Sequence, residues 1–103
     1  MEKFCQVLIS ATSKKEADRI SDNLVQKRLV AGSLILKGPS RYWWEGKIVE
    51  KEYFNVQAFS VFKNKDKIIS EAKKGHSDEC PIIAFFAMDG NADFLKWIRE
   101  SVE

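Results

Sequence analysis

The chain has 103 residues, enough for one domain but too few for two, because each half would bury too little surface to fold alone. We therefore expect a single domain spanning residues 1–103. Apolar residues make up 45% of the sequence and charged residues 31%, a composition ordinary for a globular protein and unlike a disordered one. The net charge of +2 is too small for a strong phosphate-binding field, and the densest basic stretch, residues 63–67, is broken by Asp66. This stretch fits the solvated side of a helix better than a nucleic-acid patch.

The sequence indicates neither a membrane span nor a secretion signal. Its longest apolar run, residues 82–88, is far shorter than the roughly 18 residues that a membrane helix needs. The segment after Met1 lacks the long apolar stretch and the small-residue cleavage site of a signal peptide. We expect a cytoplasmic location and no membrane partner. In that reducing compartment, Cys5 and Cys80 should be free thiols.

The first part of the chain predicts a strand, a helix and a second extended segment. The run Phe4–Ile9 is short and apolar, as in a strand. Ser13 and Glu16 then have the S-x-x-E spacing of a capping box, so a helix should begin there, and apolar residues recur beyond it at helical spacing. The pattern becomes extended again over residues 30–36, and Gly-Pro-Ser at residues 38–40 predicts a turn.

The rest of the chain predicts a hairpin, a second helix, another strand and a last helix. A strand containing Tyr42, Trp43 and Trp44 is expected to end at a tight turn formed by Glu45-Gly46. A long return strand follows. Either Asn64 or Asp66 could cap a second helix, which should stop at Gly75, a residue preferred where helices end. A buried strand is expected over residues 82–88. The last helix is indicated by the spacing of its apolar residues, Phe94, Leu95, Ile98 and Val102.

The predicted order is β-α-β-β-α-β with a trailing helix. Two β-α-β halves of this kind form the ferredoxin-like α+β sandwich, a sheet with helices on one face. The strands nevertheless carry apolar residues on both sides, more than two helices can cover: Val7, Ile9, Leu34, Leu36, Phe54, Phe59, Ile83 and Phe85. A contiguous exposed apolar face normally marks a partner surface, and self-association is the most economical partner.

Side chains that can bind a metal ion lie close together in the loop before the last strand. His76, Asp78, Glu79 and Cys80 offer imidazole, carboxylate and thiolate donors, which suit copper or zinc. Their spacing is not that of a closed structural zinc site, although neighbouring subunits could complete a site. In the alternative interpretation, His76 only follows a helix C-terminus, where a cation is favoured, and Cys80 is a small core residue beside Pro81.

The aromatic run could either stack on a ligand or pack between subunits. Trp43 and Trp44 are adjacent on a strand and therefore point to opposite faces, so they cannot form one stacking platform. Large aromatic side chains dominate interface energetics, which favours a subunit interface for Tyr42, Trp43 and Trp44. We expect no enzymatic activity, because the chain has no recognised nucleophile motif, a single histidine and no phosphate-binding glycine loop.

Several segments between Val7 and Val102 together form a recognisable pattern: residues 16–17, 27–31, 42–50, His76, Pro81 and residues 90–101. In this order and spacing they resemble the CutA divalent-cation tolerance proteins. The resemblance implies a ferredoxin-like subunit that forms a tight homotrimer related to the PII signalling proteins. It implies a link to tolerance of divalent metals, copper in particular, without an established catalytic activity. It also implies that the hairpin bearing the aromatic run wraps a neighbouring subunit.

Several positions depart from the family pattern. Gly32 stands where the family usually has a cysteine, Phe59 where it has a lysine, and Ile82 where a glutamate follows the loop proline. Ile9 replaces a cysteine proposed as a metal ligand. These departures leave the fold expectation intact and weaken the expectation of a metal site.

We therefore hypothesise a cytoplasmic, non-catalytic homotrimer that binds copper or another divalent metal, with His76 as the main ligand and Glu79 and Cys80 as its partners. The alternative is a PII-like signalling or scaffold trimer that has lost metal binding and uses the clefts between subunits for a small molecule or protein. A nucleic-acid-binding module of the RNA-recognition type is disfavoured, because the sheet lacks the required basic and aromatic pattern.

Overall fold

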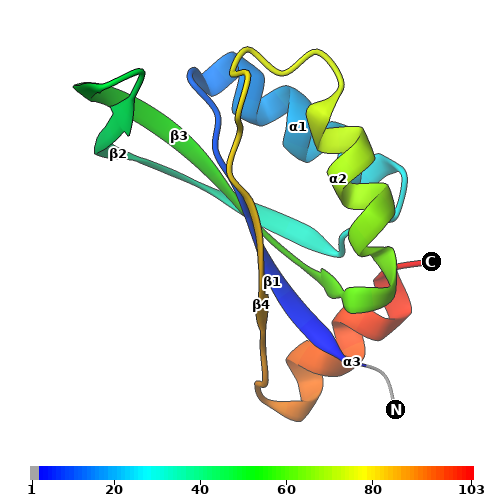
Figure 1. Cartoon of the computed structure of the whole chain (residues 1–103). Coiled ribbons are helices and arrows are strands. Elements are labelled where there is room, and N and C mark those ends of the chain that lie inside the picture. The colour runs from blue at the N-terminus through cyan, green and yellow to red at the C-terminus, as the bar shows by residue number, and fades with distance from the viewer. Residues whose placement is uncertain (1–2) are drawn as a thin grey trace.

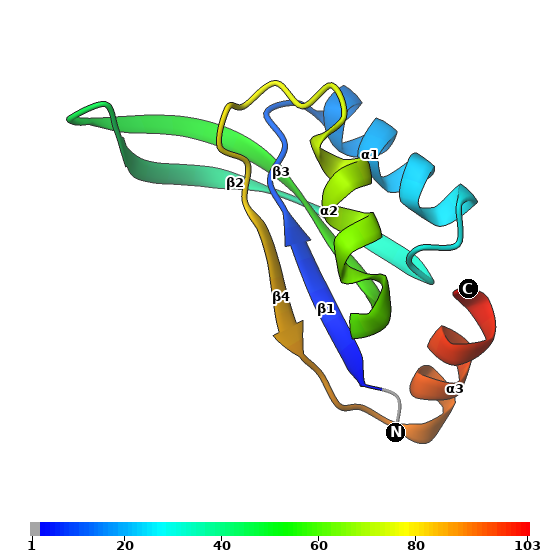
Figure 2. The ribbon, with the colours of Figure 1, turned by 45° about the vertical axis from the view of Figure 1, so that its right-hand side comes forward.

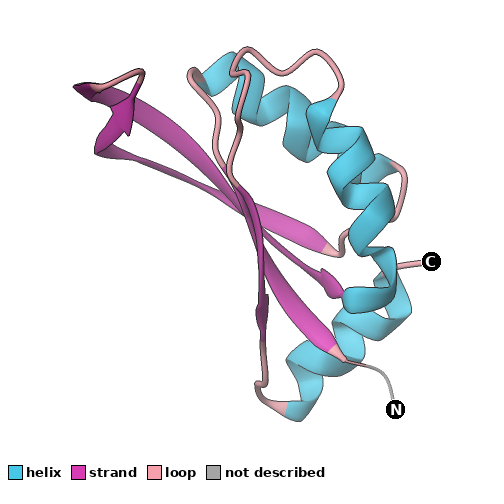
Figure 3. Cartoon of the chain, in the orientation of Figure 1, coloured by secondary structure: helices cyan, strands magenta, loops and turns pink. Residues whose placement is uncertain are grey.

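The computed structural model describes residues 3–103 and arranges them as one antiparallel sheet with three helices (Figures 1 and 3). The order along the chain is β1 (Phe4–Ile9), α1 (Lys14–Gln26), β2 (Gly32–Trp44), β3 (Lys47–Val61), the 3-10 turn η1 (Phe62–Asn64), α2 (Lys65–Lys73), β4 (Ile83–Ala87) and α3 (Ala92–Ser101). The four strands lie in the order β2-β3-β1-β4, and each neighbouring pair is antiparallel. This confirms the predicted ferredoxin-like α+β fold. None of the helices in residues 3–103 has the length and apolar character of a membrane span.

The start of α1 follows the predicted capping box only in part. Ser13 is the N-cap, and its hydroxyl accepts a hydrogen bond from the Glu16 N–H at 3.1 Å. The Glu16 side chain does not return to Ser13, however. Its Oε1 accepts instead from the Thr12 N–H at 3.0 Å, one residue further back. The carboxylate is turned toward the loop that follows α2, which offers it two further donors.

Helices α1 and α2 cover one face of the sheet, as Figure 1 shows. Alternate residues of the central strands point toward them, and each buried aliphatic side chain there stabilises the fold by roughly 1.5–3 kcal/mol. The fully or almost fully buried members of this core include Val7, Ile9, Ile20, Leu24, Val56 and Ile68.

Helix α3 packs over one end of the opposite face. The Phe94 ring meets the Phe59 ring edge to face at 5.4 Å between centroids, and Trp97 stacks on Phe94 at 6.0 Å. The Arg99 guanidinium lies 5.4 Å from the centroid of the Phe4 ring. Phe4 and Phe59 alternate along their strands with the residues that face α1 and α2. Helix α3 therefore covers part of the sheet face that α1 and α2 leave uncovered.

The rest of that face keeps exposed apolar side chains at both edges of the sheet. Leu34 and Leu36 on β2 are 54% and 46% exposed, and Phe86 on β4 is 49% exposed. The outer sides of β2 and β4 pair with no other strand in residues 3–103. Both edges are open to another chain.

The predicted turn at residues 38–40 is wrong, because β2 runs straight through it. Gly38 lies opposite Tyr53 and Pro39 opposite Glu52 in a continuous ladder. A proline is tolerated there because β2 is an edge strand, where a missing N–H need not break the sheet. As a result, β2 and β3 form one long ribbon that projects well beyond the helices (Figure 2).

The predicted hairpin turn is confirmed. Glu45 and Gly46 both have positive φ, 51° and 78°, as a two-residue type I′ turn requires, and Trp44 faces Lys47 across it.

The end of α2 is held by a side chain from α1. The helix stops at Lys73, and Gly75 takes a φ of 64°. Arg19 donates to the carbonyl oxygens of Lys74 and Gly75, each at 3.2 Å. Asn64 stands at the predicted N-cap, but its amide donates to the Leu29 carbonyl at 3.1 Å instead of capping the helix.

Candidate functional site

A cavity of about 590 Å³ lies where the projecting ribbon meets the loop of residues 77–82. Tyr42, Trp44 and Tyr53 supply rings to its wall, and Asp78 and Glu79 supply carboxylates. Trp43 and Cys80 also contribute to the lining. Most of the side chains that the sequence singled out therefore gather at this cavity, on two segments joined only by tertiary structure.

His76 stands beside the cavity with both ring nitrogens engaged. The Asp78 N–H donates to Nδ1 at 3.0 Å, so this nitrogen carries no proton. Nε2 lies 2.7 Å from the Ser10 carbonyl oxygen, which can only accept, so Nε2 carries the proton. The geometry thus fixes a neutral imidazole that fastens the loop to the end of β1.

A buried carboxylate anchors the same loop. Glu16 is 8% exposed, and Ser77 donates to it twice, from its N–H at 2.8 Å and from its hydroxyl at 2.9 Å. Burial alone would raise the pKa of the Glu16 carboxyl, but the hydrogen bonds from Thr12 and Ser77 lower it on balance. Glu16 is therefore held in its charged form.

A chain of hydroxyl groups joins the loop to the ribbon. The Tyr53 hydroxyl donates to Asp78 Oδ2 at 2.9 Å, and the Tyr42 hydroxyl lies 3.1 Å from that of Tyr53. The two rings meet nearly at right angles, with centroids 6.0 Å apart. Burial and the neighbouring Tyr42 and Asp78 raise the pKa of Tyr53 well above its ordinary value, so the phenol keeps its proton.

The other two proposed metal ligands are exposed. Among residues 3–103, the Glu79 carboxylate and the Cys80 thiol form neither a hydrogen bond nor an ion pair, and no three His, Cys, Asp or Glu side chains are grouped to hold a metal ion. The interpretation of Cys80 as a core residue is wrong, because the side chain is exposed. Neither cysteine is in a disulfide, as predicted. A metal site at His76, Glu79 and Cys80 remains a prediction.

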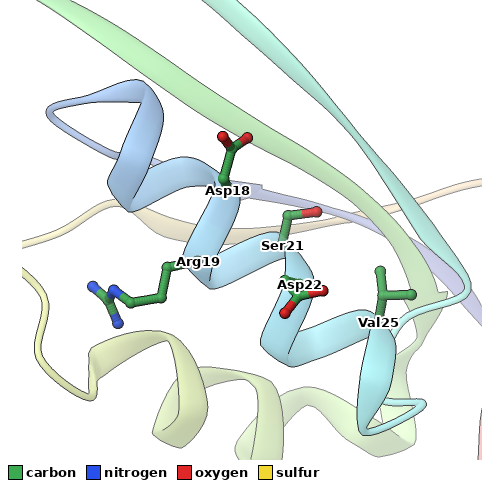
Figure 4. Close-up of a pocket in the computed structure, with 5 residues that line it drawn as sticks. All are labelled: Asp18, Arg19, Ser21, Asp22 and Val25. Carbon is green, nitrogen blue, oxygen red and sulfur yellow. The ribbon is translucent and has the colours of Figure 1, made fainter.

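A second depression, on the outer side of α1, does not bring its polar groups together. Asp18, Asp22 and Val25 project from the exposed side of the helix, whereas Arg19 points toward the loop after α2 (Figure 4). The Ser21 hydroxyl is hydrogen-bonded to that of Ser33 on β2. Such diverging side chains do not build a site.

Sequence reasoning missed two residues that shape the cavity. The sequence distinguishes Glu16 only by its capping-box spacing and its place in the family resemblance, and it does not distinguish Tyr53 from the rest of the long return strand. No local pattern marks either role, because their partners, Ser77 and Asp78, lie far away in the sequence. The opposite orientation of Trp43 and Trp44 was expected, and their exposures of 72% and 40% differ accordingly.

Comparison with known proteins decides the family. The model of the family described as CutA1 divalent ion tolerance protein matches residues 5–101. The chain belongs to the CutA1 family. A divalent-cation tolerance protein CutA from Archaeoglobus fulgidus is 35% identical over 98 residues, which cover 94% of this chain and 96% of the relative. The resemblance inferred from sequence motifs is thereby confirmed.

Solved CutA structures share the fold throughout. The structure of the periplasmic divalent cation tolerance protein CutA from A. fulgidus gives a TM-score of 0.91, with all of both chains covered. The divalent cation tolerance protein from Thermus thermophilus gives 0.90 at 30% identity, again with full coverage of both chains. CutA1 from Oryza sativa gives 0.93 at 21% identity and covers 98% of this chain and 94% of its own, which shows the fold alone.

Three of the four departures of this CutA1 chain from the family pattern occupy packed positions. A Cβ atom at Gly32 would lie 2.9 Å from Trp97 Cη2, so the absence of a side chain admits that ring. Phe59 packs on Phe94 of the same helix. Ile9 is completely buried in the core. These residues serve the packing of the chain itself, whereas Ile82 is 52% exposed and contributes to the cavity wall.

Proposed function

We propose that this single-domain chain forms a homotrimer that binds divalent metal ions, copper in particular, and contributes to metal tolerance without catalysing a reaction. The observation that carries the proposal is the match to the CutA1 divalent ion tolerance family over residues 5–101. The absence of catalysis is part of the proposal. His76, the only histidine, has both nitrogens occupied by backbone groups and is therefore poorly placed to act as a general base.

The free sheet edges support the proposed trimer. If β2 of one subunit paired with β4 of the next, the contact would join unlike surfaces, and such contacts can close into a ring. The exposed apolar residues Leu34, Leu36 and Phe86 lie on these two strands, so the same contact would remove them from water. The ribbon bearing Trp43 would extend over the neighbour.

Sedimentation velocity tests the assembly. We expect a species of three chains that persists on dilution to micromolar concentration. Leu34→Glu should dissociate it, because a charge would enter the interface. Lys63→Glu, an exposed position at η1, is the control and should leave the trimer intact. A wild-type monomer would contradict the proposed assembly.

The donors that fit a metal ion are Glu79 and Cys80. Their carboxylate and thiolate suit a cation such as Cu²⁺ or Zn²⁺, and both groups are exposed and free among residues 3–103. One subunit therefore offers two free donors, and neighbouring subunits or water would supply the others. His76 could join them only by giving up its bond to the Asp78 N–H or to the Ser10 carbonyl.

Isothermal titration of Cu²⁺ tests metal binding, with Zn²⁺ as a cation that has no redox chemistry. We expect saturable heat at a fixed ratio per trimer that is lost in Cys80→Ser and weakened in Glu79→Gln. Glu100→Gln, an exposed carboxylate on α3, is the control and should bind like the wild type. His76→Ala needs a parallel stability measurement, because it also removes two structural hydrogen bonds. An intact trimer without saturable heat would contradict the metal proposal.

A second candidate function is a PII-like signalling or scaffold trimer that has lost metal binding. It is favoured by the large cavity at the ribbon and by the lack of three grouped metal donors in residues 3–103. In that case the clefts between subunits would take a small molecule or a protein. An intact trimer that binds no metal is the result expected for this candidate.

For the location we propose the cytoplasm, where the exposed thiol of Cys80 would stay reduced. The A. fulgidus structure is described as periplasmic, so cell fractionation followed by detection of the protein is needed. Recovery in the periplasmic or extracellular fraction would overturn the proposal.

A further inference from the structure

We propose that the cavity between the ribbon and the loop of residues 77–82 binds a small organic cation, an ammonium group carrying apolar substituents. This inference goes beyond the proposed function and does not require a metal. The cavity volume of about 590 Å³ falls within the range of ligand sites in proteins. Its wall combines aromatic rings with carboxylates, and this combination favours positive charge over both anions and neutral molecules.

The rings form two walls of different orientation. Tyr42 and Tyr53 stand at 82° to one another, and Trp44 lies two residues from Tyr42, on the same side of β2. A cation within about 6 Å of such a ring face is attracted by the ring quadrupole. The chain already places one ammonium in this setting, since Lys51 Nζ lies 5.8 Å from the Tyr53 ring centroid.

The charges of the cavity leave an excess of negative charge. Asp78 and Glu79 line it, whereas the lining Arg41 is paired with Glu50 at 2.6 Å. The carboxylates of Glu50, Asp78 and Glu79 carry three negative charges. Arg41 and Lys51 carry two positive charges, so the net charge is −1. The Glu79 carboxylate has no partner among residues 3–103 and is free to meet a ligand.

One wall is held in place before any ligand arrives. Asp78 is fixed by the Tyr53 hydroxyl at 2.9 Å and by its own N–H, which donates to His76 at 3.0 Å. Its neighbour Ser77 is fixed by Glu16. A preformed wall lowers the cost of ordering a site on binding. The aromatic faces cannot coordinate a metal ion, so the arrangement suits an organic cation better than a bare one.

The site leaves part of the ribbon free for assembly. Trp43 is 72% exposed and points away from the side of β2 that Tyr42 and Trp44 share. It can therefore pack on a neighbouring subunit while the other two rings meet a ligand.

Two-dimensional NMR of the ¹⁵N-labelled protein, with chelator present, tests this proposal independently of metal binding. The probes are choline and its uncharged carbon analogue, dimethylbutanol, which has nearly the same shape. The indole N–H signal of Trp44 reports on the cavity, and that of Trp97 on α3 is an internal reference. Glu79→Gln removes one charge from the cavity, and Glu100→Gln removes one from α3. Sedimentation velocity of each sample shows whether assembly is unchanged.

We expect choline to shift the Trp44 signal saturably with millimolar affinity and to leave Trp97 unmoved. The uncharged analogue should bind at least about tenfold more weakly, and Glu79→Gln should weaken choline binding about threefold to tenfold. Glu100→Gln should bind like the wild type. The proposal is overturned if no saturation occurs up to about 50 mM choline. It is also overturned if both probes bind equally, or if the Trp44 signal follows protein concentration and not choline, which would place a neighbouring subunit in the cavity.

Discussion

Glu16 and Ser77 are 61 residues apart in the sequence, yet the Ser77 N–H and hydroxyl both donate to the Glu16 carboxylate, at 2.8 and 2.9 Å. The pair joins the first turn of α1 to the loop that carries the proposed ligands. Thr12 donates to the same carboxylate, so the Glu16 side chain connects α1 both to the segment that precedes it and to the loop that contains Ser77.

Replacing Glu16 by Gln should destabilise the fold by about 1.5–3 kcal/mol, because hydrogen bonds to a charged group are lost and an amide N–H₂ would face other donors. The measurement is urea denaturation at a fixed protein concentration. Asp18→Asn is the control: it breaks the exposed pair with Lys14 and should change stability by less than about 0.5 kcal/mol. Equal effects of the two substitutions would contradict the anchoring role.

Acid should weaken the fold through Glu16. Its pKa is lower in the folded state than the ordinary 4.5, so its contribution is complete above that pH and is lost as the pH falls below it. Denaturation midpoints measured between about pH 6 and 3 should therefore fall for the wild type. The fall should be shallower in Glu16→Gln, which has no carboxyl to protonate. An identical slope in both proteins would show that other carboxylates dominate. Glu71 is one of these, since its pKa is lowered by Lys27 and Lys74.

His76→Ala should cost about 1–3 kcal/mol in the absence of metal, because the Ser10 carbonyl and the Asp78 N–H lose their partner. Thermal unfolding with chelator present measures this loss. Cys80→Ser, at an exposed thiol, should have little effect and serves as the control. If His76→Ala were as stable as the wild type, the bonds seen around the imidazole would carry no energetic weight.

The fit of Trp97 over Gly32 predicts coupling between the two positions. Gly32→Ala places a methyl group 2.9 Å from the indole and should destabilise by about 1 kcal/mol. The cost should disappear in a Trp97→Leu background, which opens the space. A double-mutant cycle by urea denaturation measures the coupling, and additive effects would contradict the proposed contact.

The two cysteines should differ sharply in reactivity. Cys80 is exposed, whereas burial raises the pKa of the Cys5 thiol to about 11. Brief treatment with a maleimide followed by mass spectrometry should add one label per native chain and two after denaturation. Cys80→Ser should abolish the native label. Rapid labelling of Cys5 in the native protein would show that the core opens readily.

Elements that depend on local chemistry could be predicted correctly from the order of the residues. Ser13 starts a helix because its hydroxyl accepts an N–H three residues on, and Glu45-Gly46 turns the chain because both residues adopt positive φ. The order of strands and helices then led to the correct fold. The predicted turn at Pro39 was wrong because an edge strand can accommodate a proline. Which strand lies at the edge is known only once the sheet is assembled.

The roles of the site residues depend on contacts that form only when the chain is folded. Hydrogen bonds and burial join residues by distance in space, so no spacing in the sequence shows that His76 has both nitrogens engaged or that Tyr53 meets Asp78. The same holds for Gly32, whose missing side chain has a reason only once α3 brings Trp97 across it. Local propensity therefore specified the helices, strands and the hairpin turn, and contacts between distant segments specified the chemistry of the cavity.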